Sequence, residues 1–163
     1  MVLSEHFTLA EAIRSESAKR NGISNMPSPE HIANLKQLAE NIFEPIRANF
    51  RCPILISSGY RSKELNAKIG GSNTSQHSFG QAIDIDMDGT TYGVTNAEIF
   101  HFIKDKLPFD QLIWELGNDT NPDWVHCSYS NRFRKEVLIA YKTLGTTHYK
   151  KYYANNKTEK AIL

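Results

Sequence analysis

The sequence has few cysteines, almost no net charge and no long apolar segment. Two cysteines among 163 residues argue against a disulfide framework, and Cys127 is expected to pack as a small apolar side chain. The formal net charge of +1 creates no strong positive field, so nucleic acid is not an expected partner. No apolar run approaches the roughly 20 residues that cross a membrane. The first residues also lack the basic start and apolar stretch of a secretory signal, so we expect synthesis in the cytoplasm.

The length and the periodicity of apolar residues indicate one mixed domain. We expect a single, monomeric domain over residues 1–163 that buries a core without disulfides. Capping motifs and helical spacing predict helices over residues 9–20, 29–46, 61–68 and 95–106. Apolar runs and alternation predict strands over residues 54–57, 82–88, 111–115 and 124–129. These elements indicate an α+β fold with a mainly antiparallel sheet and helices on one face. The basic tail, residues 149–163, is expected to be a polar helix or a frayed segment.

Two imidazoles and one carboxylate occur in two short motifs. His77 and Asp84 lie within SQHSFGQAID, and His126 ends a WVH motif further along the chain. Gly80, between the first two, allows the chain to bend so that both side chains reach one ion. Three nitrogen and oxygen ligands with a fourth position left for water are typical of catalytic zinc, whereas structural zinc is usually closed by thiolates. The pattern therefore predicts one zinc ion at His77, Asp84 and His126, and a hydrolase.

Calcium is the alternative cation for this segment. Asp84, Asp86, Asp88 and Gly89 reproduce the opening of an EF-hand loop. That loop needs a bidentate Glu at its twelfth position, where this chain has Thr95, and it needs a preceding helix where this chain has a predicted half-buried strand. Calcium is therefore the weaker interpretation. A second cation at Asp86 or Asp88 stays open, although we expect these carboxylates to face solvent.

The pattern SxHxxGxAxD with a downstream WVH resembles the zinc D-alanyl-D-alanine carboxypeptidase family. That group also includes the lysostaphin-type enzymes and the amino-terminal domain of sonic hedgehog. Further segments resemble the subset found in phages and prophages, namely SSGYRS at 57–62, Leu65-Asn66, GGS at 70–72 and Asn131-Arg132. The resemblance covers most of residues 7–135. It implies a hedgehog-like peptidase fold, zinc ligands at His77, Asp84 and His126, and Arg61 as the cation that steadies a substrate carbonyl or carboxylate through paired donors.

A general base is also required, because the water that attacks the peptide must lose a proton. Members of the family commonly carry an acid three residues before the last histidine, which is Asp123 here. The other candidate is Glu115, at the end of a predicted strand, where an acid recurs in the phage-type subset. Spacing slightly favours Asp123, but either can reach the water if the two strands pair as a hairpin. Ser75 and Gln76 are expected to bind substrate or to support the ligand shell.

The resemblance implies a peptidoglycan peptide as substrate, cleaved next to a D-amino acid. The phage-type motifs and the missing signal favour an endolysin-type L-alanyl-D-glutamate endopeptidase over a D-alanyl-D-alanine carboxypeptidase. Such an enzyme would act on the cell wall after release or as part of a phage particle. A second class is a non-catalytic zinc-containing wall-binding or tail module, since the hedgehog domain shows that the scaffold can bind rather than cleave. The presence of both Glu115 and Asp123 favours catalysis.

Overall fold

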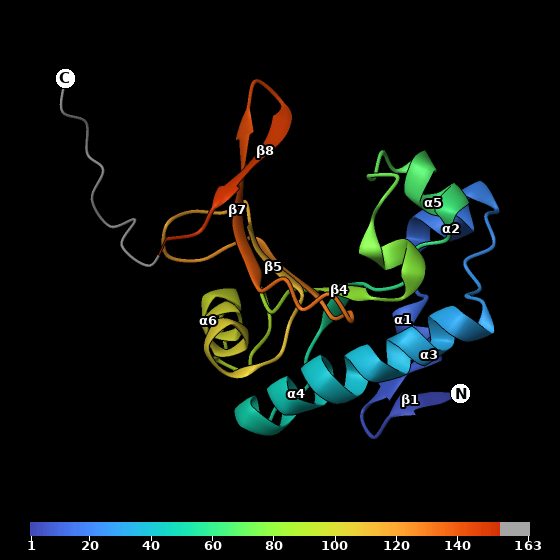
Figure 1. The fold of residues 1–163 in the computed structure, drawn as a ribbon, viewed down its shortest axis with the longest axis horizontal. Coiled ribbons are helices and arrows are strands. Elements are labelled where there is room, and N and C mark those ends of the chain that lie inside the picture. The colour runs from blue at the N-terminus through green and yellow to red at the C-terminus, as the bar shows by residue number, and fades with distance from the viewer. Residues whose placement is uncertain (154–163) are drawn as a thin grey trace.

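The computed structural model describes residues 1–153, which form a six-stranded sheet, a small amino-terminal hairpin and several helices (Figure 1). The strands are β1 Val2–Ser4, β2 Phe7–Thr8, β3 Ile56–Ser58, β4 Ala82–Ile85, β5 Gln111–Glu115, β6 Trp124–Ser128, β7 Glu136–Thr143 and β8 Thr146–Lys151. The helices are α1 Leu9–Ala12, α2 Glu16–Asn21, α3 Pro29–Leu38, α4 Glu44–Phe50, α5 Lys63–Lys68 and α6 Asn96–Lys106. A π-helical turn, η1 Ala39–Phe43, joins α3 to α4, and a 3-10 turn, η2 Gln76–Phe79, precedes β4.

The large sheet has the strand order β3-β4-β6-β5-β7-β8. Every neighbouring pair is antiparallel except β5 and β7, which are parallel. β5 and β6 form the expected hairpin, and β4 pairs with the other side of β6. The predicted α+β class with a mainly antiparallel sheet is therefore confirmed.

One face of the sheet carries the core. Side chains of β4, β6 and β5 that point to this face are buried against the rod formed by α3, η1 and α4 and against α6. The rod begins at the cap Ser28 with Pro29 in its first turn, as predicted. α6 begins with the expected capping box of Thr95 and Glu98. These helices leave the opposite face of the sheet free for the site (Figure 1).

The predicted helix over residues 9–20 is wrong in its middle, where the chain forms two short helices. The carbonyl oxygen of Ala12 accepts a hydrogen bond from the backbone N–H of Tyr60 at 2.7 Å, so it does not continue the helical ladder. Ser15 then caps α2 by accepting from the N–H of Ala18. The break lets the chain beside Gly59 approach closely, because a Cβ there would lie 2.3 Å from the Ala12 oxygen.

The predicted strand over residues 82–88 is too long, and it is not half-buried. β4 ends at Ile85 because the N–H of Met87 donates to the side-chain oxygen of Asn96, at 2.7 Å, rather than to a neighbouring strand. All residues of β4 are buried, since helices cover one face and the site covers the other. β3 likewise begins at Ile56, later than expected.

The prediction of a polar helix or frayed tail from residue 149 is wrong where the structure describes it. Residues up to Lys151 form β8, which pairs with β7 across a tight turn at Leu144 and Gly145, both with positive φ. This hairpin escaped the sequence analysis because its outer residues are exposed on both faces, so they show no apolar alternation. Residues 154–163 of the predicted tail lie outside the described residues. Within residues 1–153, the helices are too short or too polar to cross a membrane.

Candidate metal centre

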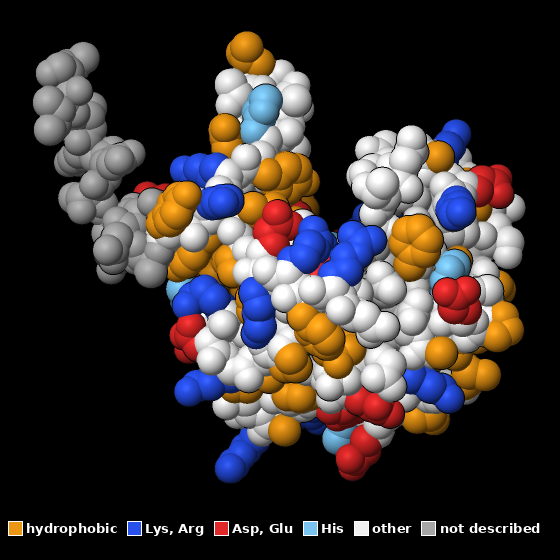
Figure 2. Space-filling model, viewed as in Figure 1, with side chains coloured by type: hydrophobic (Ala, Val, Ile, Leu, Met, Phe, Trp, Pro, Cys, Tyr) orange, Lys and Arg blue, Asp and Glu red, His pale blue; other side chains and the backbone are white. Residues whose placement is uncertain are grey.

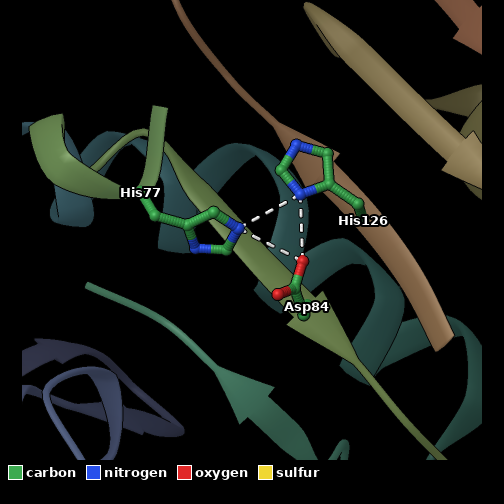
Figure 3. Close-up of side chains that lie close together, drawn as sticks. All are labelled: His77, Asp84 and His126. Atoms are coloured by element: carbon green, nitrogen blue, oxygen red, sulfur yellow. Dashed lines mark hydrogen bonds and ion pairs between the residues drawn. The ribbon is translucent and has the colours of Figure 1, made fainter. Parts of the chain in front are cut away.

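His77, Asp84 and His126 converge on the open face of the sheet (Figure 3). Nε2 of His77 lies 3.1 Å from Nδ1 of His126 and 3.2 Å from Oδ1 of Asp84. Nδ1 of His126 lies 2.9 Å from the same carboxylate oxygen. All three side chains are buried, and they come from η2, β4 and β6. Among residues 1–153 they are the one group of three or more His, Cys, Asp or Glu that could hold a metal ion.

Local structure explains why these segments meet. In the antiparallel register of β4 and β6, Asp84 stands directly opposite His126, so both side chains point to the same face. Gly80 ends η2 in the left-handed conformation, with φ of 69°. A Cβ at this position would lie 2.4 Å from the backbone oxygen of His31. Glycine is therefore required at the bend that carries His77 back over β4.

The outer contacts of the three groups fix their orientation. Nδ1 of His77 donates to the backbone oxygen of Gly59 at 2.7 Å, which leaves the Nε2 lone pair of the neutral imidazole facing Asp84. The other oxygen of Asp84 accepts from Nη2 of Arg61 at 2.5 Å. Nε of Arg61 donates to the hydroxyl of Ser58 at 2.8 Å. Arg61 therefore contacts the predicted ligand Asp84 directly, a contact that was not predicted from the sequence.

The arrangement fits a bound cation. With Nδ1–H of His77 committed to Gly59, Nε2 of His77 and Oδ1 of Asp84 are two acceptors 3.2 Å apart, and a cation or an added proton must lie between them. Metal bonds of about 2.0–2.2 Å at tetrahedral angles place ligand atoms about 3.3 Å apart, close to the separations found here. Burial opposes charge on Asp84, but the imidazoles of His77 and His126 outweigh it and hold its pKa well below the usual range. Two histidines and an ionised carboxylate form an open ligand set of the catalytic zinc type.

Glu115 lies beside this centre. It stands opposite Trp124 in the register of β5 and β6, on the same face as His126. Glu115 is only 8% exposed, and burial, with the charge of Asp84 adding to it, raises the pKa of its carboxyl to about 7. Glu115 and the group of His77, Asp84 and His126 line one cleft of about 610 Å³. A carboxyl with this pKa can accept and release a proton near neutral pH.

Asp123 is placed elsewhere. Asp123 comes just before β6 and lies two positions before Val125, whose side chain points to the helical face, so strand alternation turns Asp123 away from the face that carries His126. The side chain of Asp123 is exposed. Asp123 borders a separate depression beside Trp114 and Asp119, not the cleft of the metal centre. Of the two predicted bases, the structure brings Glu115 to the centre and leaves Asp123 away from it. Strand alternation accounts for the difference, whereas spacing along the chain had slightly favoured Asp123.

Ser75 and Gln76 both line the cleft. The side chain of Gln76 is already engaged, because its Nε2 donates to Asp110 at 2.8 Å and its Oε1 accepts from Arg134 at 3.1 Å. Nε and Nη2 of Arg134 also donate to the fully buried carboxylate of Asp110. Burial disfavours charge on Asp110, but these hydrogen bonds hold its pKa well below the usual range.

This network holds η2, the turn that carries His77, against the loops flanking β5 and β6. Asp110 and Arg134 were not among the residues predicted from the sequence. The one available signal was an acidic residue inside the apolar run from Leu107 to Trp114, since a buried carboxylate needs partners.

The segment after β4 does not form a calcium loop. The carboxylate of Asp86 accepts from the N–H of Asp88 at 3.0 Å and from the amide of Asn96 at 3.3 Å. The carboxylate of Asp88 accepts from Asn121 at 3.2 Å. These contacts fix the connection between β4 and α6, and the preceding element is a strand, so the EF-hand interpretation lacks its helix.

A buried His-Asp-His group that shares one cleft with a second carboxyl is an arrangement typical of metal-dependent hydrolases. Comparison with protein families matches residues 5–128 to peptidase M15. The chain therefore belongs to the peptidase M15 family, whose members are zinc peptidases. A comparison with curated proteins finds no match. The family match ends with β6, so the β7–β8 hairpin lies beyond it.

Proposed function

We propose that this chain, as one domain, is a zinc peptidase that cleaves peptidoglycan stem peptides next to a D-amino acid. The single observation that supports it most is the convergence of His77, Asp84 and His126 with Glu115 in one cleft of an M15 chain. These three residues would hold one zinc ion. Zinc, when bound, lowers the pKa of a coordinated water and polarises the scissile carbonyl.

Glu115 is the proposed general base. Its pKa of about 7 suits a group that takes a proton from the attacking water and then passes it to the leaving amine. Asp84 remains ionised and does not compete for this proton. Glu115 is buried where β5 pairs with β6, and its side chain lines the cleft.

Arg61 has two roles in this proposal. Through Nη2 it orients Asp84, and through its remaining donors it binds a substrate carbonyl or carboxylate in the cleft. Ser75 lines the cleft, and within residues 1–153 its hydroxyl makes no hydrogen bond, so it is available to substrate. Gln76 instead positions η2 through Asp110 and Arg134.

The endopeptidase reaction between L-alanine and D-glutamate is the favoured form of this activity. The phage-type motifs support it, and so does a cleft lined on both sides of the centre, by the 70–76 segment and by β7 and β8. Such an enzyme would reach the wall after release from a cell or on a phage particle. A D-alanyl-D-alanine carboxypeptidase is the second candidate, because Arg61 and Arg132 both line the cleft and could bind a terminal carboxylate.

Incubation with purified peptidoglycan, followed by mass spectrometry of the released fragments, tests the proposal. A new D-glutamate amino terminus identifies the endopeptidase, and loss of terminal D-alanine identifies the carboxypeptidase. At unchanged zinc content, we expect Glu115→Gln to lower turnover about 100-fold or more and Asp123→Asn to change it by less than about threefold. Zinc-loaded protein that releases no fragment would refute the proposed peptidase and favour the wall-binding alternative.

A further inference from the structure

The β7–β8 hairpin forms one wall of the cleft. Only Glu136–Ala140 of β7 pairs with β5, so the rest of the hairpin extends beyond the sheet. Figure 1 shows it rising on the open side of the sheet, across from α5. Figure 2 shows a hollow between these two walls, with basic side chains along its floor. The hairpin adds a surface that the family-matched segment, residues 5–128, does not contain.

The two faces of the hairpin differ. In the register of β7 and β8, Lys142 pairs with Thr147 and Ala140 with Tyr149, and these side chains share the front face. Lys142, Thr147 and Tyr149 line the same cleft as the metal-binding group. On the back face the ring of Tyr141 stacks on His148, with centroids 5.5 Å apart. The aromatic side chains of the back face therefore pack on each other, whereas the side chains of the front face point toward the cleft.

Tyr149 is aligned with the proposed base. Glu115 pairs with Ala140, and Ala140 pairs with Tyr149, so these residues form one row across β5, β7 and β8. The spacing of strands puts Tyr149 and Glu115 about 10 Å apart at their Cα atoms. The small Ala140 between them leaves room for the tyrosine ring to lean toward Glu115. Partial burial and the charges of Glu115 and Asp84 raise the pKa of Tyr149, which agrees with this direction.

The cleft also has cations that the protein does not neutralise. Arg61 pairs with Asp84, and Arg134 pairs with Asp110. Among the described residues, no ion pair or side-chain hydrogen bond reaches the charged groups of Lys142 or Arg132, which both border the cleft. A bound divalent ion adds further positive charge. The cleft is thus suited to an anionic peptide.

We propose that the front face of the β7–β8 hairpin binds the substrate, with Lys142 and Tyr149 as specificity-determining residues for a peptide that carries a free carboxylate next to the scissile bond. The inference rests on the proposed peptidase function and deepens it. Lys142 pairs with the substrate carboxylate, and Tyr149 contacts the substrate backbone beside Glu115. A stem peptide with D-glutamate joined through its side chain has such a free carboxylate, and its amidated form does not.

A matched pair of synthetic peptides tests this. L-Ala-γ-D-Glu-L-Lys with its lysine carboxyl blocked as an amide is compared with the same peptide amidated also at the α-carboxyl of D-glutamate, and kcat/KM is measured for each with zinc-loaded protein. Wild type should prefer the acid about tenfold, the effect of one hydrogen-bonded charge pair. Lys142→Ala should bring the acid-to-amide ratio close to one. Tyr149→Ala should raise KM for both peptides about tenfold, and Tyr149→Phe should show whether the hydroxyl is responsible.

The back face supplies the control. Lys150 lies over the ring of Tyr141, 5.7 Å from its centroid, so Lys150→Ala removes a hairpin lysine of the same charge on the opposite face. It should retain the wild-type preference. Equal cleavage of acid and amide by wild type, or Lys142→Ala and Tyr149→Ala both behaving like Lys150→Ala, would overturn the inference while leaving the peptidase proposal intact.

A binding measurement shows whether the hairpin inference or the peptidase proposal has failed. Calorimetric titration of zinc-loaded Glu115→Gln with the acid peptide does not require turnover. Weaker binding when Lys142→Ala is added to this variant supports the hairpin inference even if no peptide is cleaved. No measurable binding by Glu115→Gln together with no cleavage by wild type would reject both proposals.

Discussion

At the scale of single residues, the state of each group in the centre follows from its nearest neighbours. The backbone oxygen of Gly59 fixes the tautomer of His77, and the imidazoles keep Asp84 ionised. Glu115 has the opposite environment, in which burial keeps its carboxyl protonated up to about pH 7. Two carboxyls on one face of the sheet thus suit the two tasks proposed for them, Asp84 as a metal ligand and Glu115 as a proton carrier.

The raised pKa of Glu115 predicts a pH-dependent stability of the metal-free protein. The contribution of the Glu115 carboxyl to the free energy of unfolding is fully present below its unfolded pKa of 4.5. It is lost as the pH rises through the folded pKa of about 7, because the unfolded chain can ionise Glu115 more easily than the folded protein can. The loss is on the order of 3 kcal/mol in the free energy of unfolding. A glutamine at this position does not titrate. The melting temperature of Glu115→Gln should therefore rise relative to that of wild type as the pH increases from 5 to 8.

Thermal unfolding of both proteins in chelator, over this pH range, checks the prediction. Glu5→Gln, a substitution at an exposed carboxyl, serves as control. A difference between Glu115→Gln and wild type that stays constant from pH 5 to 8 would show that Glu115 is not held in a desolvated position.

At the scale of elements, the sequence predicted best those helices and strands whose local signals, such as a capping box or an apolar run, are not overridden by contacts with distant residues. The capping box at Thr95 and the apolar run of β5 placed α6 and β5 correctly. The prediction of a helix from residue 9 to residue 20 was wrong because the carbonyl oxygen of Ala12 accepts a hydrogen bond from the N–H of Tyr60, which lies 48 positions further along the chain. β4 ended early because Asn96 captures the N–H of Met87. Such long-range hydrogen bonds are not visible in local periodicity.

The turn at Gly80 predicts a specific defect. Gly80→Ala would place a Cβ 2.4 Å from the oxygen of His31 at a left-handed position, which should cost roughly 1–3 kcal/mol of stability and weaken zinc binding by displacing His77. Gly22→Ala is the matched control, because Gly22 also ends a helix with positive φ but has nothing within 4 Å of the added Cβ. Melting temperature and zinc affinity are measured for both variants. Equal effects of the two substitutions on zinc affinity would contradict the role of this turn.

At the scale of the whole molecule, the centre joins parts of the chain that are distant in sequence. The motif spacing identified the three proposed ligands, because the order of residue types is itself distinctive. It could not choose between Glu115 and Asp123, since that choice depends on which face of a paired strand each residue occupies. Nor could it find Arg134 or the β7–β8 hairpin, whose importance lies in where the sheet places them.

Because the proposed ligands come from η2, β4 and β6, zinc should stabilise the entire fold. A free zinc concentration 100 times the dissociation constant adds about 2.7 kcal/mol. For a domain of this size, the melting temperature should rise by about 5–10 °C. His77→Ala should abolish the increase, and Asp123→Asn should retain it. An equal increase in His77→Ala would mean that zinc binds elsewhere.

Anomalous diffraction at the zinc edge, from crystals of protein purified without chelator, tests the central claim most directly. The account predicts one strong peak about 2.0–2.2 Å from Nε2 of His77, Nδ1 of His126 and Oδ1 of Asp84, with Glu115 facing the ion's open side. A peak at another group of side chains, or none between these three in protein that contains stoichiometric zinc, would contradict it.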